Sequence, residues 1–113
     1  MADLNSLDYR LVPWAKWIHR IGTNYDGRLV VTSARRSWAK QAELRSKWER
    51  GISKIPATRP GTSLHEYGLA FDLARIGIDP LTDPLLAALG ALWERVGGRW
   101  GGIRDPVHFQ PIM

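Results

Sequence analysis

The 113-residue chain contains no cysteine and no long apolar run, and each absence excludes a class of structure. Without cysteine there is no disulfide framework and no thiolate metal site, so any metal has to be held by histidine and carboxylate. No stretch reaches the roughly 18 consecutive apolar residues that a membrane-spanning helix needs. The opening residues MADLNSLDYR also lack the basic stretch and apolar run of a secretory signal. We therefore expect no export signal and no membrane insertion.

Acidic residues are in deficit. The chain has 11 Asp and Glu against 16 Lys and Arg, a formal net charge of +5. A basic surface favours polyanions such as nucleic acid, anionic lipid, or the teichoic acid and carboxylate-rich peptides of a bacterial wall. Much of the charge lies in ARRSWAKQAELRSKWERGISK, where Glu43 and Glu49 interrupt the basic residues as on a solvated helix face. A nucleic-acid binder would rest on this charge alone, without a recognised reading motif, so we expect no nucleic-acid partner.

Length and composition are those of one globular domain. The chain is 44% hydrophobic and 24% charged, which suits a protein with a hydrophobic core and does not suit a disordered one. It has no internal repeat and no low-complexity segment. We predict a single domain over residues 1–113.

Helix start and stop signals predict three main helices. Pro13 suits a first helical turn, and Ser37 and Asp83 are good N-cap residues. A glycine follows each helical pattern, as is common just past a helix end. The predicted helices cover residues 13–21, 38–50 and 84–96, followed by Gly22, Gly51 and Gly97.

The strand signals are few and short. RLVVTSA (residues 28–34) and LAFDLA (residues 69–74) are rich in β-branched or alternating apolar residues, and a last short strand is predicted around His108. Residues 52–62 carry prolines and glycine and predict a surface loop. Short strands interleaved with helices favour an α+β domain with a small, mainly antiparallel sheet over a doubly wound fold.

The chain has only three histidines, and two of them lie in a chemically suggestive context. His19 falls in the first predicted helix and is best explained as a packing or surface residue. His65 and His108 each lie beside a short strand, with glycine and the carboxylates of Asp72 and Asp105 nearby. Two imidazoles and one carboxylate form the ligand set of hydrolytic zinc sites that keep a fourth position open for water.

The spacing of His65 and Asp72 decides whether they can share such a site. They are seven residues apart, which puts them on opposite faces of one strand and almost two turns apart on one helix. If His65 projects from the loop and Asp72 from the following strand, a turn at Gly68 can bring both to one point. Asp72 shares its strand face with Ala70 and Ala74, which leaves room around the carboxylate. Taken alone, the pair remains a weak signal, because a strand aspartate also often caps or forms an ion pair.

The pattern around the pair is more restrictive. It has the form S-x-H-x-x-G-x-A-x-D, filled by Ser63, His65, Gly68, Ala70 and Asp72, with SARRSWAKQAEL upstream and GGRWGGIRDPVHFQ downstream. These three ordered blocks resemble the zinc peptidases of bacterial peptidoglycan: the VanY-like D-alanyl-D-alanine carboxypeptidases and the phage-endolysin L-alanyl-D-glutamate peptidases. The resemblance extends over almost the whole chain and implies the hedgehog/DD-peptidase fold.

Matched position by position, the resemblance implies a complete site. The implied residues are His65, Asp72 and His108 as ligands of one zinc ion, Asp105 and Arg36 for catalysis, and Arg36 and Ser63 for substrate binding. Three of these have alternatives that the sequence leaves open. Asp105 before Pro106 is also a good turn former, Arg36 could be a solvated cation, and Ser63 could be a turn residue.

Some positions depart from the family pattern or carry no implied role. Arg35 stands where an aromatic residue is usual, Arg99 replaces a common acidic residue, and the proline near the last histidine is shifted to Pro106. These departures concern substrate fit more than the metal site. Four further residues are interpreted as surface, helix-packing or core positions: Gln41, Glu66, Trp93 and Trp100.

The resemblance implies zinc-dependent hydrolysis of an amide bond in the peptidoglycan stem peptide by a monomeric enzyme. Cleavage between L-Ala and D-Glu is the first choice, because the ending GG-x-W…D-x-x-HF looks like the endolysin branch. A D-alanyl-D-alanine carboxypeptidase is the alternative within the enzymes, and a non-catalytic zinc-containing wall-binding domain is the alternative of another class. We expect synthesis in the cytoplasm of a phage-infected bacterium, with access to the wall after release or as part of a virion.

Overall fold

The computed structural model describes residues 2–54 and 56–112 and has an α+β fold, as predicted. Its helices are α1 (Val12–Tyr25), α2 (Trp38–Glu49) and α3 (Pro84–Arg95). Its strands are β1 (Leu29–Ser33), β2 (Phe71–Arg75), β3 (Gly98–Trp100) and β4 (His108–Pro111). Short 3-10 turns are η1 (Leu4–Ser6), η2 (Leu64–Tyr67), η3 (Pro80–Thr82) and η4 (Gly102–Arg104). No helix in the described ranges is both long and apolar enough to cross a bilayer.

The four strands form one antiparallel sheet in the order β1-β2-β4-β3. In the central pair, Phe71 lies opposite Phe109 and Asp72 lies opposite His108. The register between β1 and β2 shifts between Val31 and Ser33, next to the end of β1. This mainly antiparallel sheet is the one that the sequence predicts.

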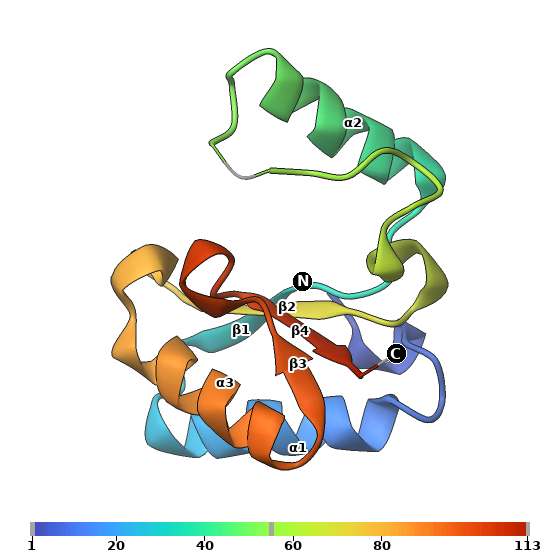
Figure 1. The fold of residues 1–113 in the computed structure, drawn as a ribbon. Helices are drawn as coiled ribbons and strands as arrows, with labels where there is room; N and C mark the ends of the chain where they lie inside the picture. Colours follow the sequence, from blue (N-terminus) through green and yellow to red (C-terminus); the bar gives the residue numbers. More distant parts are fainter. Residues whose placement is uncertain (1, 55, 113) are drawn as a thin grey trace.

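The sheet separates an apolar layer from a polar one. Helices α1 and α3 lie on one side of it, and α2 with the loop of residues 52–54 and 56–62 lies on the other (Figure 1). On the side covered by α1 and α3, the rings of Phe71 and Phe109 stack at a centroid distance of 5.5 Å, and Trp93 meets Phe71 edge-on at 5.4 Å. Because side chains alternate along a strand, Asp72 and His108 point away from this core.

Helix α1 is longer than predicted, and the expectation that Gly22 ends it is wrong. The helix continues to Tyr25, and Gly22 is buried inside it. A Cβ atom at Gly22 would overlap the side chain of Leu29 and crowd that of Leu89. The glycine therefore permits close packing of the helix on the sheet, a role with the same sequence signal as a helix end.

Strand β3 escaped prediction because glycine has a low strand propensity. Gly98 lies directly against the indole of Trp93, where a Cβ atom would collide with the ring. The indole nitrogen of Trp93 donates a hydrogen bond to the backbone oxygen of Gln110 at 2.8 Å. The core position expected for Trp93 is confirmed, and Trp100 is partly buried against the same core.

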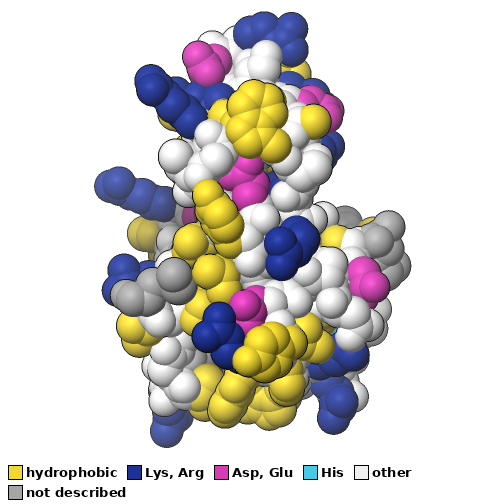
Figure 2. All heavy atoms as spheres, turned by 90° about the vertical axis from the view of Figure 1, so that its right-hand side faces the viewer, with side chains coloured by type: hydrophobic (Ala, Val, Ile, Leu, Met, Phe, Trp, Pro, Cys, Tyr) yellow, Lys and Arg dark blue, Asp and Glu magenta, His cyan; other side chains and the backbone are white. Residues whose placement is uncertain are grey.

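The predicted caps of the other two helices are confirmed. The Ser37 hydroxyl accepts a hydrogen bond from the backbone of Lys40 at 3.0 Å, and the Asp83 carboxylate accepts one from the backbone of Leu85 at 2.9 Å. Helix α2 has the mixed-charge surface that the sequence indicates, with ion pairs Lys47–Glu43 at 3.0 Å and Arg45–Glu49 at 2.9 Å. Figure 2 shows basic and acidic side chains interspersed at this end of the molecule.

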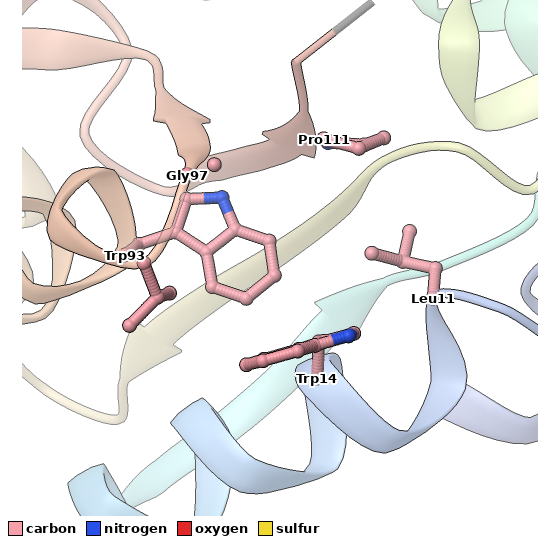
Figure 3. Close-up of a pocket in the computed structure, with 7 residues that line it drawn as sticks. Leu11, Trp14, Trp93, Gly97 and Pro111 are labelled. Carbon is pink, nitrogen blue, oxygen red and sulfur yellow. The ribbon is translucent and has the colours of Figure 1, made fainter.

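A small apolar hollow of about 140 Å³ lies on the side of the sheet that α1 and α3 cover, where Trp14 and Leu11 face Trp93 and Pro111 (Figure 3). The residues that line it are Leu11, Trp14, Trp93, Val96, Gly97, Gly98 and Pro111. Because none of these carries a titratable or metal-ligating side chain, the hollow offers no acid–base or metal chemistry.

Candidate metal centre and its cleft

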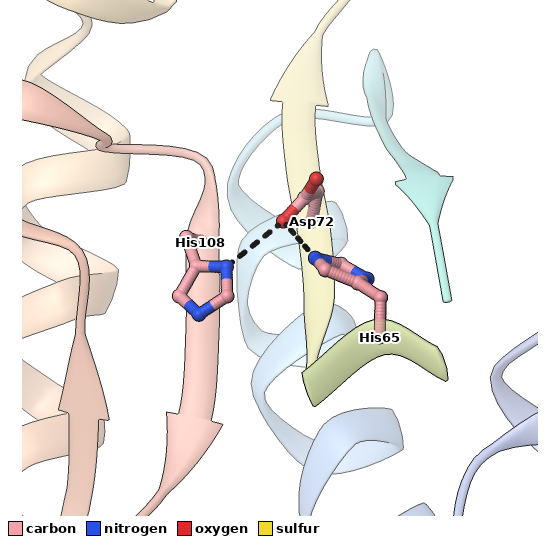
Figure 4. A group of neighbouring side chains, drawn as sticks. All are labelled: His65, Asp72 and His108. Carbon is pink, nitrogen blue, oxygen red and sulfur yellow. Dashed lines mark ion pairs between the residues drawn. The ribbon is translucent and has the colours of Figure 1, made fainter. Parts of the chain in front are cut away.

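His65, Asp72 and His108 converge on one point. Their ligand atoms all lie within 4.8 Å of one another, although they come from η2, β2 and β4 (Figure 4). Nε2 of His65 lies 3.1 Å from Oδ1 of Asp72, and Nδ1 of His108 lies 3.5 Å from the same oxygen. The structure thus brings together the three residues that the resemblance implies as zinc ligands.

The local sequence explains how His65 reaches the strands. Ser63 and Glu66 form a capping box at the start of η2, and Gly68 ends this turn with a φ of +70°. That left-handed conformation suits glycine. A Cβ atom at Gly68 would also meet the guanidinium of Arg35 and the backbone nitrogen of Asp8. The predicted turn at Gly68 is confirmed.

Each imidazole is oriented by a hydrogen bond at its other ring nitrogen. Nδ1 of His65 lies 2.8 Å from the backbone oxygen of Ala34, and Nε2 of His108 lies 2.7 Å from Oε1 of Gln110. Both partners are acceptors, so these nitrogens carry the protons. The lone pairs of His65 Nε2 and His108 Nδ1 are thereby free to face Asp72, as in histidines prepared for a metal.

Asp72 completes the donor set. Its Oδ2 accepts a hydrogen bond from Arg36 at 2.9 Å, whereas its Oδ1 is buried and has no hydrogen-bond partner among the described residues. Burial alone would raise the pKa of Asp72, but hydrogen bonds that His108 and His65 donate once their imidazoles are protonated outweigh it and hold this pKa far below its usual range. Burial disfavours the charged form of His108, yet Asp72 raises its pKa. Both shifts mean that the site attracts positive charge.

These observations test whether a metal fits. An unpaired buried carboxylate oxygen facing two imidazole lone pairs is costly, and a cation between them satisfies all three. Two histidines and one aspartate suit zinc, which accepts three protein ligands and one open position in catalytic sites. The residues present therefore fit a zinc ion.

Arg36 is held by protein partners on all three of its nitrogens. Nε donates to Oγ of Ser33 at 2.9 Å, Nη1 to Oε1 of Gln41 at 3.2 Å, and Nη2 to Asp72. Its side chain is 17% exposed, so it is not a solvated surface cation. The neighbouring Arg35 turns away, and its Nε donates to the backbone oxygen of Ser6 at 2.8 Å.

Ser63 and Asp105 both line the same cleft as the three convergent residues. The Ser63 hydroxyl accepts a hydrogen bond from the backbone nitrogen of His65 at 3.2 Å, so it also shapes the turn. Asp105 follows η4, and its backbone oxygen accepts a hydrogen bond from the backbone of His108 at 3.1 Å. Burial raises the pKa of the Asp105 carboxyl above its usual range, although the charge of His108 opposes this.

Sequence reasoning missed the roles of three polar residues. Gln41 is 1% exposed and bonded to Arg36, Gln110 orients His108, and both carboxylate oxygens of Glu66 accept from the backbone of Gly61. Gln41 lies in the upstream block SARRSWAKQAEL that carries the resemblance, and this was the available signal. Nothing in the sequence alone indicates the partners of Gln110 or Glu66.

The cleft above the site has a volume of about 400 Å³. One side of it is formed by the convergent histidines and Asp72, and the other by helix α2 and the loop residues Ser53, Pro56, Ala57 and Thr58. The described residues that line it are Thr32, Arg36, Gln41, Leu44, Ser53, Pro56, Ala57, Thr58, Ser63, His65, Asp72, Ala74, Pro80, Asp105, Val107 and His108. A pocket of this size falls within the range of small-molecule and peptide sites.

No family model and no curated protein sequence matches the chain, but solved structures do. A mutant of the vancomycin resistance D,D-pentapeptidase VanY from a VanB-type cassette, in complex with Zn(II), superposes with a TM-score of 0.70 and 21% identity, covering 95% of this chain and 73% of that one. VanYB in complex with D-alanine-D-alanine matches equally well, at 0.70 and 21%, covering 95% and 72%. The Serratia marcescens L-Ala D-Glu endopeptidase ChiX matches at 0.61 and 22%, covering 96% and 83%.

The chain has the fold of these peptidases. At 21–22% identity the likeness establishes the architecture alone. It agrees with the hedgehog/DD-peptidase fold that the resemblance implies.

Proposed function

We propose that the protein is a zinc-dependent peptidase that hydrolyses an amide bond in the peptidoglycan stem peptide. The observation that carries the proposal is the convergence of His65, Asp72 and His108 around a buried, unpaired carboxylate oxygen at the base of a cleft. The fold supports it, because solved structures of the same fold include a VanY in complex with Zn(II) and the endopeptidase ChiX.

His65, Asp72 and His108 would hold the zinc ion, which when bound would supply a Lewis acid for the scissile carbonyl and for lowering the pKa of water toward ~7. Asp105 provides the acid–base group. It takes a proton from the attacking water and passes it to the leaving amine. Its partial burial and raised pKa suit a carboxylate that has to hold a proton between the two steps.

Arg36 has two roles in this proposal: it orients Asp72 and it binds substrate. Its bond to Oδ2 of Asp72 fixes the direction in which Oδ1 points. A guanidinium has five N–H groups, and three of those of Arg36 are bonded to protein. The remaining N–H groups are available to a stem-peptide carboxylate or to the oxygen that gains charge during attack. Ser63 lies in the same cleft and contributes a hydroxyl there.

Within this class, we propose cleavage between L-Ala and D-Glu. The cleft of about 400 Å³ offers more room than the terminal alanine of a carboxypeptidase substrate requires, and it suits a peptide that continues past the cut bond. The endopeptidase ChiX also shares the fold, with 83% of its length covered. A D-alanyl-D-alanine carboxypeptidase is the second candidate, favoured by the likeness to VanYB in complex with D-alanine-D-alanine.

A non-catalytic wall-binding domain is less well supported, because Asp105 provides an acid–base group in the cleft. We further propose that the enzyme acts as a monomer on the wall, as an endolysin or a virion component.

Mass spectrometry of peptidoglycan digested by the purified protein tests this function. New N-terminal D-Glu on stem peptides is the expected product, and free D-Ala would instead indicate the carboxypeptidase. Absence of any cleavage by protein with a full complement of zinc would overturn the enzymatic proposal.

A further inference from the structure

We infer that Gln41 is a positioning residue that ties the loop over the cleft to the Arg36–Asp72 pair. This inference rests on the proposed function and extends it to a residue outside the metal ligands. It starts from the burial of Gln41, whose side chain is 1% exposed although glutamine is mostly a surface residue. A buried amide needs partners for both its oxygen and its nitrogen.

The two ends of the amide bond to different parts of the site. Oε1 accepts from Nη1 of Arg36 at 3.2 Å, and Nε2 donates to the backbone oxygen of Thr58 at 2.9 Å. The partners fix the orientation of the amide, because a guanidinium only donates and a carbonyl only accepts. Since Arg36 in turn bonds Oδ2 of Asp72 at 2.9 Å, a continuous chain of hydrogen bonds runs from the loop to the proposed metal ligand.

The loop at the far end of this chain is part of the cleft. Ser53, Pro56, Ala57 and Thr58 all line it. Helix α2 and the loop together form an arm that stands on the polar side of the sheet (Figure 1). A second residue of α2, Arg45, also bonds the loop: its Nη1 donates to the backbone oxygen of Ala57 at 3.1 Å. Gln41 differs from Arg45 in that it also reaches the metal side of the cleft.

Two substitutions of Gln41 separate the effect of its bond to Arg36 from the effect of its bond to Thr58. In Gln41→Glu, the ionised carboxylate still accepts from Arg36 but cannot donate to Thr58, so the loop loses its bond to residue 41 while Asp72 stays held. In Gln41→Leu both bonds are lost. We therefore expect Gln41→Glu to raise KM with kcat nearly unchanged, and Gln41→Leu to lower kcat as well. Loss of such a supporting contact typically costs about 10–100-fold in activity or metal affinity, and we expect kcat/KM of Gln41→Leu to fall in that range.

Hydrogen exchange and metal binding test the same chain without catalysis. Amides of residues 56–62 are expected to exchange faster in both variants, and zinc affinity, measured by chelator competition, is expected to fall only in Gln41→Leu. Arg45→Met is the matched control, because it frees the loop from α2 without touching Arg36, and its kcat and zinc affinity should equal those of the parent.

Parental kinetics and parental loop exchange in Gln41→Leu would overturn the inference, as would equal zinc affinities in Gln41→Leu and Gln41→Glu. The exchange and zinc measurements remain decisive even if the parent proves not to cleave peptidoglycan, so failure of the proposed function and failure of this inference are distinguishable.

Discussion

Asp72 and His108 lie directly opposite each other on the paired strands β2 and β4, with Oδ1 of the aspartate 3.5 Å from Nδ1 of the histidine. Antiparallel pairing thus sets the positions of two of the three proposed ligands, and the turn at Gly68 positions the third, His65. Because the register of the central strands fixes the distance between these two side chains, the core that holds this register also holds the proposed ligands together.

The first prediction concerns the choice of histidines. His65→Ala should lose zinc and activity together, because the ligand set drops from three to two. His19→Ala is the control, since Nε2 of His19 lies 3.2 Å from the backbone oxygen of Leu29, away from the cleft. Zinc content by elemental analysis and hydrolysis of a soluble muropeptide measure both effects. Equal losses in two folded variants would show that the ligands are misassigned.

Asp105→Asn should keep zinc but lose most activity. The amide cannot take a proton from water, while His65, Asp72 and His108 are untouched. General acid–base groups typically contribute ~10²–10⁴-fold, and we expect kcat to fall within that range. A near-parental rate in a variant with full zinc content would assign proton transfer to another group.

The sequence predicts the residues of the proposed metal site and most helices and strands, but not the contacts that hold these residues in place. Ser63, His65, Gly68 and Asp72 are readable because their spacing forms a motif within one segment. The role of Gln110 depends on which atom of a folded strand faces which ring nitrogen, and one-dimensional spacing does not contain this information.

Glycine shows the same limit in the fold. Gly22 and Gly51 give the same stop signal in the sequence, yet Gly51 follows the end of α2 with a φ of +72°, and Gly22 lies inside α1 against Leu29. Only the packed structure shows whether a glycine is needed for its backbone conformation, as at Gly51, or for the lack of a side chain, as at Gly22. Strand β3 was not predicted for a related reason: it begins at Gly98, a glycine that packs against the indole of Trp93.

Gly22→Ala should therefore destabilise the protein even though alanine favours helices by about 1 kcal/mol over glycine. Overpacking of a tight core costs typically about 1–3 kcal/mol, so after the gain in helix propensity we expect the free energy of unfolding in urea to fall by up to about 2 kcal/mol. Gly27→Ala is the matched control, because a Cβ atom there meets nothing within 4 Å and φ is not positive. Stability raised by about 1 kcal/mol in Gly22→Ala would mean that Leu29 can move away without cost.

Arg36→Lys should weaken both zinc binding and catalysis. Lysine keeps the charge, but a single ammonium cannot reproduce the bonds to Ser33, Gln41 and Asp72. We expect kcat/KM to fall about 10–100-fold, measured at fixed salt so that bulk electrostatics stay constant. Arg35→Lys is the control, because Arg35 bonds the backbone oxygens of Ser6 and Glu66 and does not bond Ser33, Gln41 or Asp72. Loss of activity only in Arg35→Lys would reverse the two roles.

The last prediction concerns Gln110, whose Oε1 lies 2.7 Å from Nε2 of His108. Gln110→Leu removes this acceptor, so the imidazole loses the contact that keeps its Nδ1 lone pair toward Asp72, and zinc affinity should fall about 10–100-fold. Gln110→Glu keeps an acceptor with more negative charge and should bind zinc at least as tightly as the parent. The fold should survive in both, because the backbone oxygen of residue 110 accepts from Trp93 in either case. Chelator competition measures the affinities. Parental affinity in Gln110→Leu would show that strand pairing alone orients His108.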